Sequence, residues 1–345
     1  MSAKPRIEYL DLAKGFCITL VVLHHILISY HSAMPIPHVF AAIRLPLYFF
    51  LSGCFFKPYD GFTDFLKHKT NKLLIPFTFW FLFISVLIAY VYGQLGIPVF
   101  SRKPISFLYS VRQFCHEASF INLPIWFLLC LFEINIIFYL IHILVYKLFH
   151  RRQTLCISLI SLLLGLVGIL LYRHNIAIPL YFRKALWSLP FFAFGYICFR
   201  HTPIIKPNSS DKYIPLILIA LALFLYFLTP HESIIDPTIP TPPQTYLLYY
   251  LSGFAGALFI ILLSKCIQYL PLFRWWGRYS IIILILHGPF YLHIVYLFRH
   301  YHLFPDQPWT ATLITLALTM ACCSAAIPIC KRFFPHVTAQ KDLIR

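Results

Sequence analysis

Long apolar stretches recur along the whole chain, and short segments rich in proline, glycine and charge separate them. A helix that crosses the hydrocarbon core of a membrane needs about 20 predominantly apolar residues. Windows of about 19 residues predict ten spans: 10–30, 36–56, 74–97, 121–146, 154–172, 180–199, 213–229, 245–264, 279–299 and 309–330. The pattern predicts an all-α integral membrane protein, a single bundle of about ten transmembrane helices that forms one domain over residues 1–345.

Composition and charge agree with this class. Hydrophobic residues make up 60% of the chain and charged residues 11%, whereas about a quarter of a soluble domain is charged. The net charge of +17 does not indicate a nucleic-acid partner, because cytoplasmic loops of membrane proteins collect lysine and arginine. With the N-terminus inside, the inner segments carry 20 of these residues and the outer segments seven. We expect both termini to be cytoplasmic and the chain to lie in the cell (inner) membrane.

The N-terminal region and the cysteines exclude two further features. Glu8 and Asp11 interrupt the basic N-terminus, and the first apolar run is too long for a signal peptide, so we expect a retained helix. The ten cysteines show no metal-binding spacing, and only Cys115 falls in a polar loop. The sequence therefore predicts neither a disulfide framework nor a metal cofactor.

The first span carries titratable side chains at membrane depth, where they are costly and normally face a bundle interior. Lys14 and His25 are eleven residues apart, so they share one helix face and lie about 16 Å apart along the axis. His24 points about 100° away, toward a neighbouring helix. This spacing fits a cation at the inner end of a cavity and a base deep within it. It also fits structural histidines with a lysine that extends to the membrane surface.

The second span and the segment before the third carry more basic residues. Arg44 cannot lose its proton in practice, so it must pair or reach water. It fits a substrate site or an interface position equally well. Gly53 of the second span would let two helix backbones approach closely. Lys69 and Lys72 would share a face of a helix and suit the phosphates of an anionic ligand, although topology alone also predicts lysines there.

Glu133 and His287 lie near the middle of their predicted spans. An ionisable residue at this depth indicates a functional cavity. A carboxylate or a carbonyl partner would fix the tautomer of a buried histidine, and Glu133 is the best intramembrane candidate for that role.

Six stretches of the chain together resemble a known family, the integral-membrane acyltransferase-3 family, which includes bacterial polysaccharide O-acetyltransferases. They are RIEYLDLAKGFCITLVVLHH (6–25), LPLYFFLSGCFF (45–56), KTNKLLIPF (69–77), LPIWFLLCLFEINIIFYLI (123–141), KALWSLPFFAFGYICFR (184–200) and WGRYSIIILILHGPF (276–290). Lys14 and His25 fit the family's first-helix signature, a basic residue and a histidine with ten positions between them. The helix with Glu133 is most similar to the branch grouped with fucose 4-O-acetylases. Lysines stand at 14, 69 and 72, where the family often has arginine.

The resemblance implies transfer of an acyl group, usually acetyl, from cytoplasmic acyl-coenzyme A to a sugar or glycan hydroxyl. Acetyl-CoA would be the co-substrate, with polysaccharide modification as the outcome and membrane lipid as the surroundings. Catalytic roles would fall to His25 as general base, with Glu133 as its partner. Substrate binding would involve Lys14, Arg44, Lys69, Lys72 and His287. Two routes stay open: direct attack on the thioester, or an acyl-histidine intermediate.

Two other function classes fit part of the pattern. A proton-coupled transporter of a glycan precursor or small solute also uses intramembrane histidine, glutamate and arginine, although no internal repeat is visible. A structural partner in a glycan assembly complex would tolerate the loss of Lys14 and His25. The acceptor, the length of the acyl group and the oligomeric state are left open by the sequence.

Overall fold

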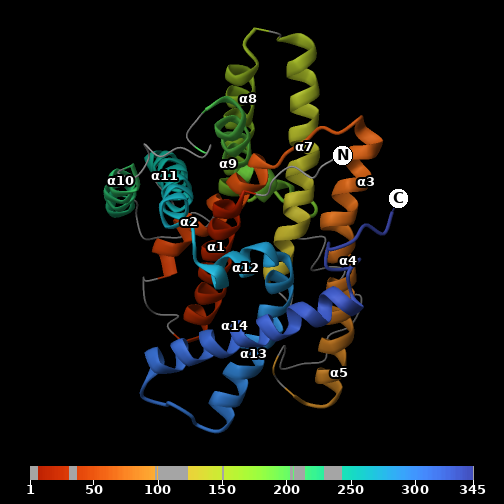
Figure 1. The fold of residues 1–345 in the computed structure, drawn as a ribbon, viewed down its shortest axis with the longest axis vertical. Helices are drawn as coiled ribbons and strands as arrows, with labels where there is room; N and C mark the ends of the chain where they lie inside the picture. Colours follow the sequence, from red (N-terminus) through yellow and green to blue (C-terminus); the bar gives the residue numbers. More distant parts are fainter. Residues whose placement is uncertain are drawn as a thin grey trace.

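The computed structural model describes residues 7–30, 37–97, 99, 123–149, 151–202, 205, 214–228 and 243–344. Cys115 and most of the loop between residues 229 and 244 lie outside these ranges. All regular structure within them is helical (Figure 1). The helices are α1 (Glu8–Tyr30), α2 (Pro37–Cys54), α3 (Phe62–Lys69), α4 (Ile75–Trp80), α5 (Ala89–Gln94), α7 (Trp126–Leu148), α8 (Gln153–Arg173), α9 (Phe182–His201), α10 (Ile214–Leu228), α11 (Pro243–Ile267), α12 (Pro271–Arg278), α13 (Ser280–His300) and α14 (Pro308–Phe333). Two π-helical stretches, η1 (Thr70–Leu74) and η2 (Phe81–Ile88), and a short 3₁₀ turn, η3 (Leu123–Ile125), complete them.

Six helices in the described part of the chain are long and apolar enough to cross a membrane. They are Glu8–Tyr30, Trp126–Leu148, Gln153–Arg173, Tyr246–Ile267, Ser280–His300 and Pro308–Phe333. Helices also occupy the four other predicted spans, but they are shorter, broken or less apolar. The described part of the chain is thus all-helical, and its apolar helices indicate a multi-pass membrane protein. Ten crossings remain a prediction.

Helix α1 lies in the middle of the bundle and packs against α2, α11, α12, α13 and α14. Helix α9 packs between α2 and α8, and α10 packs on α11 at the edge of the view in Figure 1. Helix α14 crosses obliquely over α13 in the same view. The side chains of α1 therefore meet several neighbours, and those of His24 and His25 lie against other residues inside the bundle.

Two helix crossings depend on glycine. A Cβ atom at Gly53 of α2 would collide with the backbone of Phe192 on α9, and one at Gly195 would collide with Phe50 in return. This confirms the close approach expected at Gly53. On the other side of the bundle, Gly277 of α12 lies directly against the backbone of α1 at Asp11. That contact fixes α12, a short helix that hydropathy did not predict, beside Lys14.

The helix that contains the third predicted span, 74–97, begins well before that span. Helical structure is continuous from Phe62 to Gln94 through α3, η1, α4, η2 and α5. The first part of this rod, up to Lys72, is polar and precedes the apolar segment. A π-helical turn changes which side of a helix the following residues face, and such turns often occur at functional sites. Lys72 lies in one of them, η1.

Candidate active site

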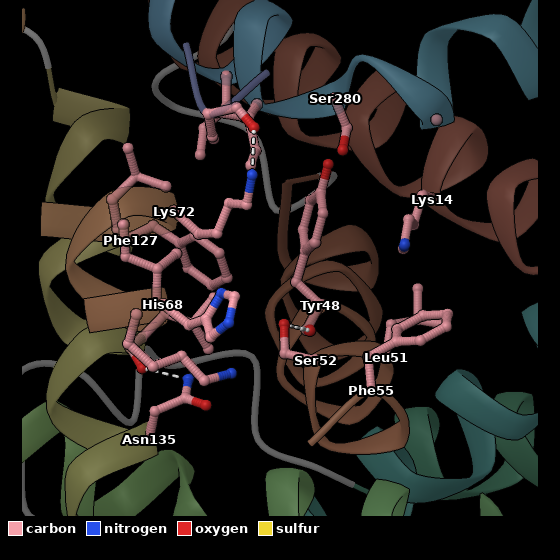
Figure 2. A pocket seen from close by; sticks show the side chains of 18 of the residues that line it. Lys14, Tyr48, Leu51, Ser52, Phe55, His68, Lys72, Phe127, Asn135 and Ser280 are labelled. Atoms are coloured by element: carbon pink, nitrogen blue, oxygen red, sulfur yellow. Dashed lines mark hydrogen bonds between the residues drawn. The ribbon is translucent and has the colours of Figure 1, made fainter. Parts of the chain in front are cut away.

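A cavity of about 510 Å³ opens between α1, α2, α3, α7, α12 and α13. Five basic side chains line it, and we call them the basic cluster: Lys14, His68, Lys69, Lys72 and Arg278. None of the described residues that line the cavity is acidic. Figure 2 shows Lys14 on one side and His68 and Lys72 on the other, with Tyr48 and Ser52 between them. These basic side chains favour an anionic ligand in the cavity.

Three members of the basic cluster have acidic neighbours, and the longest of these contacts is 4.0 Å, from His68 Nε2 to Asp64 Oδ1. Lys14 Nζ lies 3.9 Å from Asp11 Oδ1 and 4.2 Å from the centre of the Phe55 ring. Lys72 Nζ lies 2.8 Å from Asp342 Oδ1 and donates a hydrogen bond of 3.1 Å to the Ala339 carbonyl oxygen. Each cation is therefore held in place before any ligand arrives.

Lys69 differs from its neighbours. Its ammonium lies 5.6 Å and 6.0 Å from the ring centres of Phe65 and Phe56, and within the described ranges no carboxylate lies within 4.0 Å of it. Burial, together with the like charge of Lys57, lowers the pKa of Lys69 to about 8. Lys69 therefore stays protonated at neutral pH and presents an uncompensated positive charge to the cavity.

The rest of the cavity is mostly apolar. Side chains of α7 and α13 form one wall, among them Phe127, Leu131 and Leu284. Leu284 precedes His287 by three residues, about 4.5 Å along α13. The cavity thus combines basic side chains with apolar walls, which suits a ligand that has both anionic groups and a thin, uncharged arm.

A second group of polar residues lies deeper, about 16 Å from Lys14 along α1. We call it the imidazole cluster: His24, His25, His287, Arg44 and Tyr291. The ring centre of His25 lies 5.6 Å from that of His287, 6.2 Å from that of Tyr291 and 5.4 Å from that of His24. Tyr291 could not be expected here from the sequence pattern.

The protonation of His287 follows from its hydrogen bond. Its Nδ1 lies 2.8 Å from the Ile283 carbonyl oxygen, which can only accept, so the neutral ring carries its proton on Nδ1. Nε2 is then an acceptor, and it is buried with no hydrogen-bond partner among the described residues. A buried lone pair without a donor is costly, so it is ready for a ligand's hydroxyl group.

Arg44 joins the imidazole cluster through His24. Arg44 Nη2 lies 2.7 Å from His24 Nε2, and a guanidinium only donates, so the imidazole accepts. The expectation that His24 faces a neighbouring helix is confirmed. Arg44 is 8% exposed. Among the described residues, its buried Nε has no hydrogen-bond partner and no carboxylate pairs with it.

Glu133 lies elsewhere. It is 3% exposed, and its Oε1 accepts a hydrogen bond of 3.2 Å from the backbone amide of Tyr181, just before α9. The cavity-lining residue nearby is Asn135, which points about 200° away from Glu133 on the same helix. A contact between Glu133 and His25 therefore remains a prediction.

The predicted residues thus form two groups and one outlier. Lys14, Lys69 and Lys72 share the cavity, and His25 and His287 share the imidazole cluster. Sequence reasoning missed the cavity roles of Arg278, His68 and Asn135. Arg278 was counted only as a topological charge, although it follows the Gly277 that packs on α1. No cluster of three or more potential metal ligands occurs within the described ranges.

Comparison with known proteins identifies the family. A family model described as an acyltransferase domain, that of the acyltransferase-3 family, matches residues 7–327. No curated protein and no solved structure matches the chain significantly. The matched region includes the basic cluster, the imidazole cluster and Glu133, and it covers most of the 345 residues. The chain therefore belongs to the acyltransferase-3 family, whose general chemistry is acyl transfer.

Proposed function

We propose that the protein transfers an acyl group, in the first instance acetyl, from acyl-coenzyme A to a hydroxyl group of a sugar or glycan. The observation that carries this proposal is the cavity, which combines the basic cluster with apolar walls and is lined by Leu284, a residue of the same helix as His287. Coenzyme A has the matching shape: phosphate groups, then a long, thin arm that ends in the thioester.

The donor end rests on charge. Lys14, Lys69 and Lys72 are the proposed phosphate ligands, and Arg278 adds a fourth cation. Lysine acts as a point charge, whereas arginine grips a phosphate with two parallel hydrogen bonds. Lysines at the three positions where the family often has arginine therefore give a looser donor geometry with the same charge.

The reacting end rests on histidine chemistry. A sugar hydroxyl is a poor nucleophile, and an imidazole is the side chain best suited to remove its proton near neutral pH. In the proposed step His25 accepts the hydroxyl proton while the oxygen attacks the thioester carbonyl carbon. The C–S bond then breaks, and the proton passes from His25 to the leaving sulfur. The products are the acyl ester and coenzyme A.

The other predicted residues have supporting roles in this proposal. Arg44 faces the carbonyl oxygen, where negative charge develops during the attack. His287 accepts a hydrogen bond from the acceptor sugar through Nε2. Glu133 keeps its proposed role as the carboxylate partner of His25, whereas the Ile283 carbonyl oxygen orients His287. The alternative route, through an acyl group on His25, uses the same residues and differs in kinetics.

The proposed topology is ten spans with both termini cytoplasmic, in the inner membrane. One observation supports it: Lys14 near the start of α1 and Gln340 near the end of the chain line the same cavity, so both ends of the described chain lie at one side of the bundle. The basic cluster would then face the cytoplasm, where acyl-coenzyme A is made.

The test uses the purified full-length protein and acetyl-coenzyme A labelled in the acetyl group. We expect thioester consumption to rise when a crude glycan extract is added, with the label recovered in the glycan as an ester. Coenzyme A alone should raise the melting temperature, because a ligand that binds only the folded state stabilises it. Protein that neither binds nor consumes the donor would contradict the proposal and favour a transporter.

The affinity for coenzyme A is expected to depend on pH through Lys69. Its pKa of about 8 means that the ammonium is lost as the pH rises above that value, so phosphate binding should weaken by up to about tenfold per pH unit there. Lys69→Arg keeps its charge at all these values and should give a flatter profile. Titration calorimetry from about pH 7 to about pH 9.5, at constant ionic strength, measures the affinity of the wild-type protein and of Lys69→Arg for coenzyme A. Parallel profiles for the two proteins would show that Lys69 does not contact the donor.

A further inference from the structure

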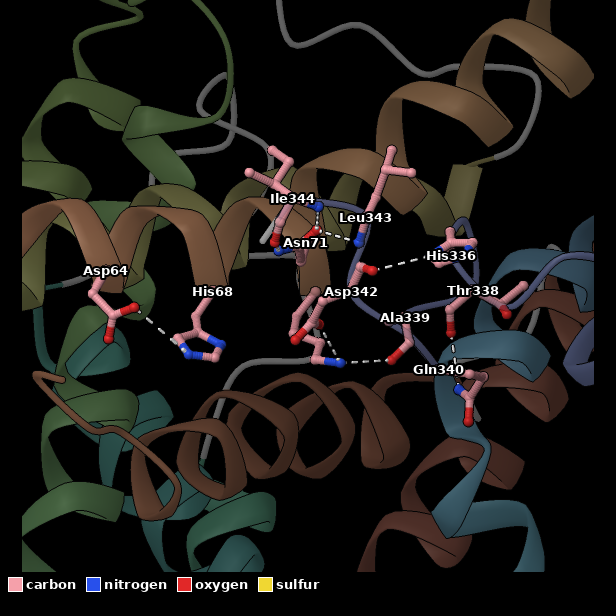
Figure 3. Close-up of polar contacts among 11 residues, drawn as sticks. Asp64, His68, Asn71, His336, Thr338, Ala339, Gln340, Asp342, Leu343 and Ile344 are labelled. Atoms are coloured by element: carbon pink, nitrogen blue, oxygen red, sulfur yellow. Dashed lines mark hydrogen bonds and ion pairs between the residues drawn. The ribbon is translucent and has the colours of Figure 1, made fainter.

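The C-terminal segment, residues 334–344, folds back from the end of α14 onto the helix that carries Lys69 and Lys72 (Figure 3). Asn71 holds its far end. The Asn71 Oδ1 accepts hydrogen bonds of 2.8 Å from the backbone amides of Leu343 and Ile344, and Nδ2 donates one of 2.8 Å to the Ile344 carbonyl oxygen. Asn71 is 2% exposed, so this clasp is a built feature of the protein.

A second anchor holds the near end of the segment. Trp80 Nε1 donates a hydrogen bond of 2.8 Å to the Val337 carbonyl oxygen, and the Trp80 ring packs against Phe334 with their centres 6.2 Å apart. Neither anchor uses the charge of Lys72. We therefore expect the C-terminal segment to stay bound to Asn71 and Trp80 when Lys72 exchanges Asp342 for another partner.

The C-terminal segment is also part of the cavity. Ala339 and Gln340 lie in its wall, beside the basic cluster. The family match ends at residue 327, so this part of the wall comes from chain beyond the matched domain. Whatever the segment contributes to ligand binding is a property of this chain that the family match does not supply.

We propose that the C-terminal segment is an element of the donor site, and that Asp342 occupies on Lys72 the place that a phosphate group of the donor takes in the complex. The inference rests on the proposed function and adds a residue that sets donor affinity. The Lys72 and Asp342 side chains are 42% and 39% exposed, and an ion pair this open to water is weak. A phosphate group offers more negative charge and more acceptor oxygens than a carboxylate.

Asp342 therefore lowers the affinity for the donor, because it competes with the donor's phosphate for Lys72. The neighbouring residues Ala339 and Gln340 still form part of the cavity wall. Of the described acidic residues that pair with the basic cluster, Asp342 makes the shortest contact, 2.8 Å against 3.9 Å for Asp11 and 4.0 Å for Asp64. Removing its charge frees Lys72 without removing the wall, because the Asn71 and Trp80 anchors remain.

The test measures binding of coenzyme A to purified full-length protein. Asp342→Asn is expected to tighten binding by up to about fivefold, the factor that corresponds to the strength of an exposed ion pair. Asp306→Asn changes the net charge equally, but Asp306 lies in the loop between α13 and α14, so it should leave binding unchanged. With Lys72→Gln in the background, the gain from Asp342→Asn should vanish, since the two residues act as a pair.

The role of the wall is tested separately. Asn71→Ala opens the clasp and is expected to weaken binding of coenzyme A several-fold. Trp80→Phe removes the other anchor's hydrogen bond and should act in the same direction, which guards against a variant that fails to fold. Tighter binding in both variants would overturn the proposal, because the C-terminal segment would then only block the cavity and would not contribute to donor binding.

The proposed function and this inference fail in different ways. If wild-type protein does not bind coenzyme A, the proposed function fails and the inference falls with it. If wild-type protein binds coenzyme A and Asp342→Asn matches Asp306→Asn, only the inference is overturned.

Discussion

His25→Ala is expected to lower kcat by about 10²- to 10⁴-fold, the usual contribution of a positioned general base. The dissociation constant of coenzyme A should stay within about twofold of the wild-type value, since His25 lies about 16 Å from Lys14 along α1 and does not line the donor cavity. The measurement is the rate of labelled acetyl transfer to glycan, together with titration of coenzyme A. A variant that binds the donor and turns over at the wild-type rate would exclude His25 as the base.

A histidine outside the imidazole cluster provides the matched control. His293 lies on α13, where its Nδ1 and Nε2 contact the Pro289 carbonyl oxygen and the Tyr92 hydroxyl. His293→Gln also removes a partly buried imidazole, and it should keep most of the activity. An equal loss in both variants would show that the imidazoles are structural.

The two chemical routes can be separated with the same protein. If an acyl group rests on His25, rapid denaturation at neutral pH of wild-type protein with labelled donor and no acceptor should trap label on the chain, and His25→Ala should trap none. Direct attack on the thioester should trap none in either protein.

The spacing of residues within one helix was predictable, because helical geometry is local. Eleven residues separate Lys14 and His25, and both lie toward α13: Lys14 lines a cavity with Ser280 of that helix, and His25 contacts His287. The glycine at position 53 could also be assigned to a close crossing, since a missing side chain permits only a few kinds of contact.

The orientation of Glu133 could not be predicted from sequence. Apolar residues occur on every side of α7, so hydropathy does not show which face meets α9 and which meets the cavity. The contact with the Tyr181 amide and the cavity position of Asn135 are set by packing between helices. The charge of Glu133 and its depth in the span identified a buried carboxylate. Which group it contacts depends on how the helices pack, and that packing cannot be read from the sequence of α7.

The C-terminal segment was invisible for a related reason. It has no apolar period, and its position depends on hydrogen bonds from Asn71 and Trp80, which are more than 250 residues away in the chain. Hydropathy finds apolar segments and cannot show that the polar start of α3 continues the same helix. The wall of the donor cavity therefore emerged only with the fold.

Arg44→Gln is expected to lower kcat by about 10²- to 10³-fold, as the loss of an oxyanion donor does. Arg44 is a buried guanidinium with an imidazole and no carboxylate as its partner among the described residues. A buried charge without a counterion is costly, and it becomes favourable when a negative charge forms beside it. The tetrahedral intermediate of acyl transfer provides that charge on the former carbonyl oxygen.

Arg183→Gln is the matched control for Arg44. Arg183 is also buried, at 9% exposure, but it donates to the Ile176 carbonyl oxygen and stacks on Tyr172. Its loss should lower the melting temperature and leave kcat largely unchanged. If Arg44→Gln behaves in the same way, with a lower melting temperature and wild-type kcat, Arg44 is a structural residue.

His24→Ala decides whether Arg44 acts on the substrate or through its neighbour. If Arg44 only holds His24, removing the His24 ring should reproduce the full loss of kcat. If Arg44 stabilises the oxyanion, His24→Ala should cost less than Arg44→Gln, because the guanidinium keeps its charge when its acceptor is removed. Arg44→Lys should then recover part of the rate, since a point charge at this position still attracts the oxyanion but lacks the planar pair of donors.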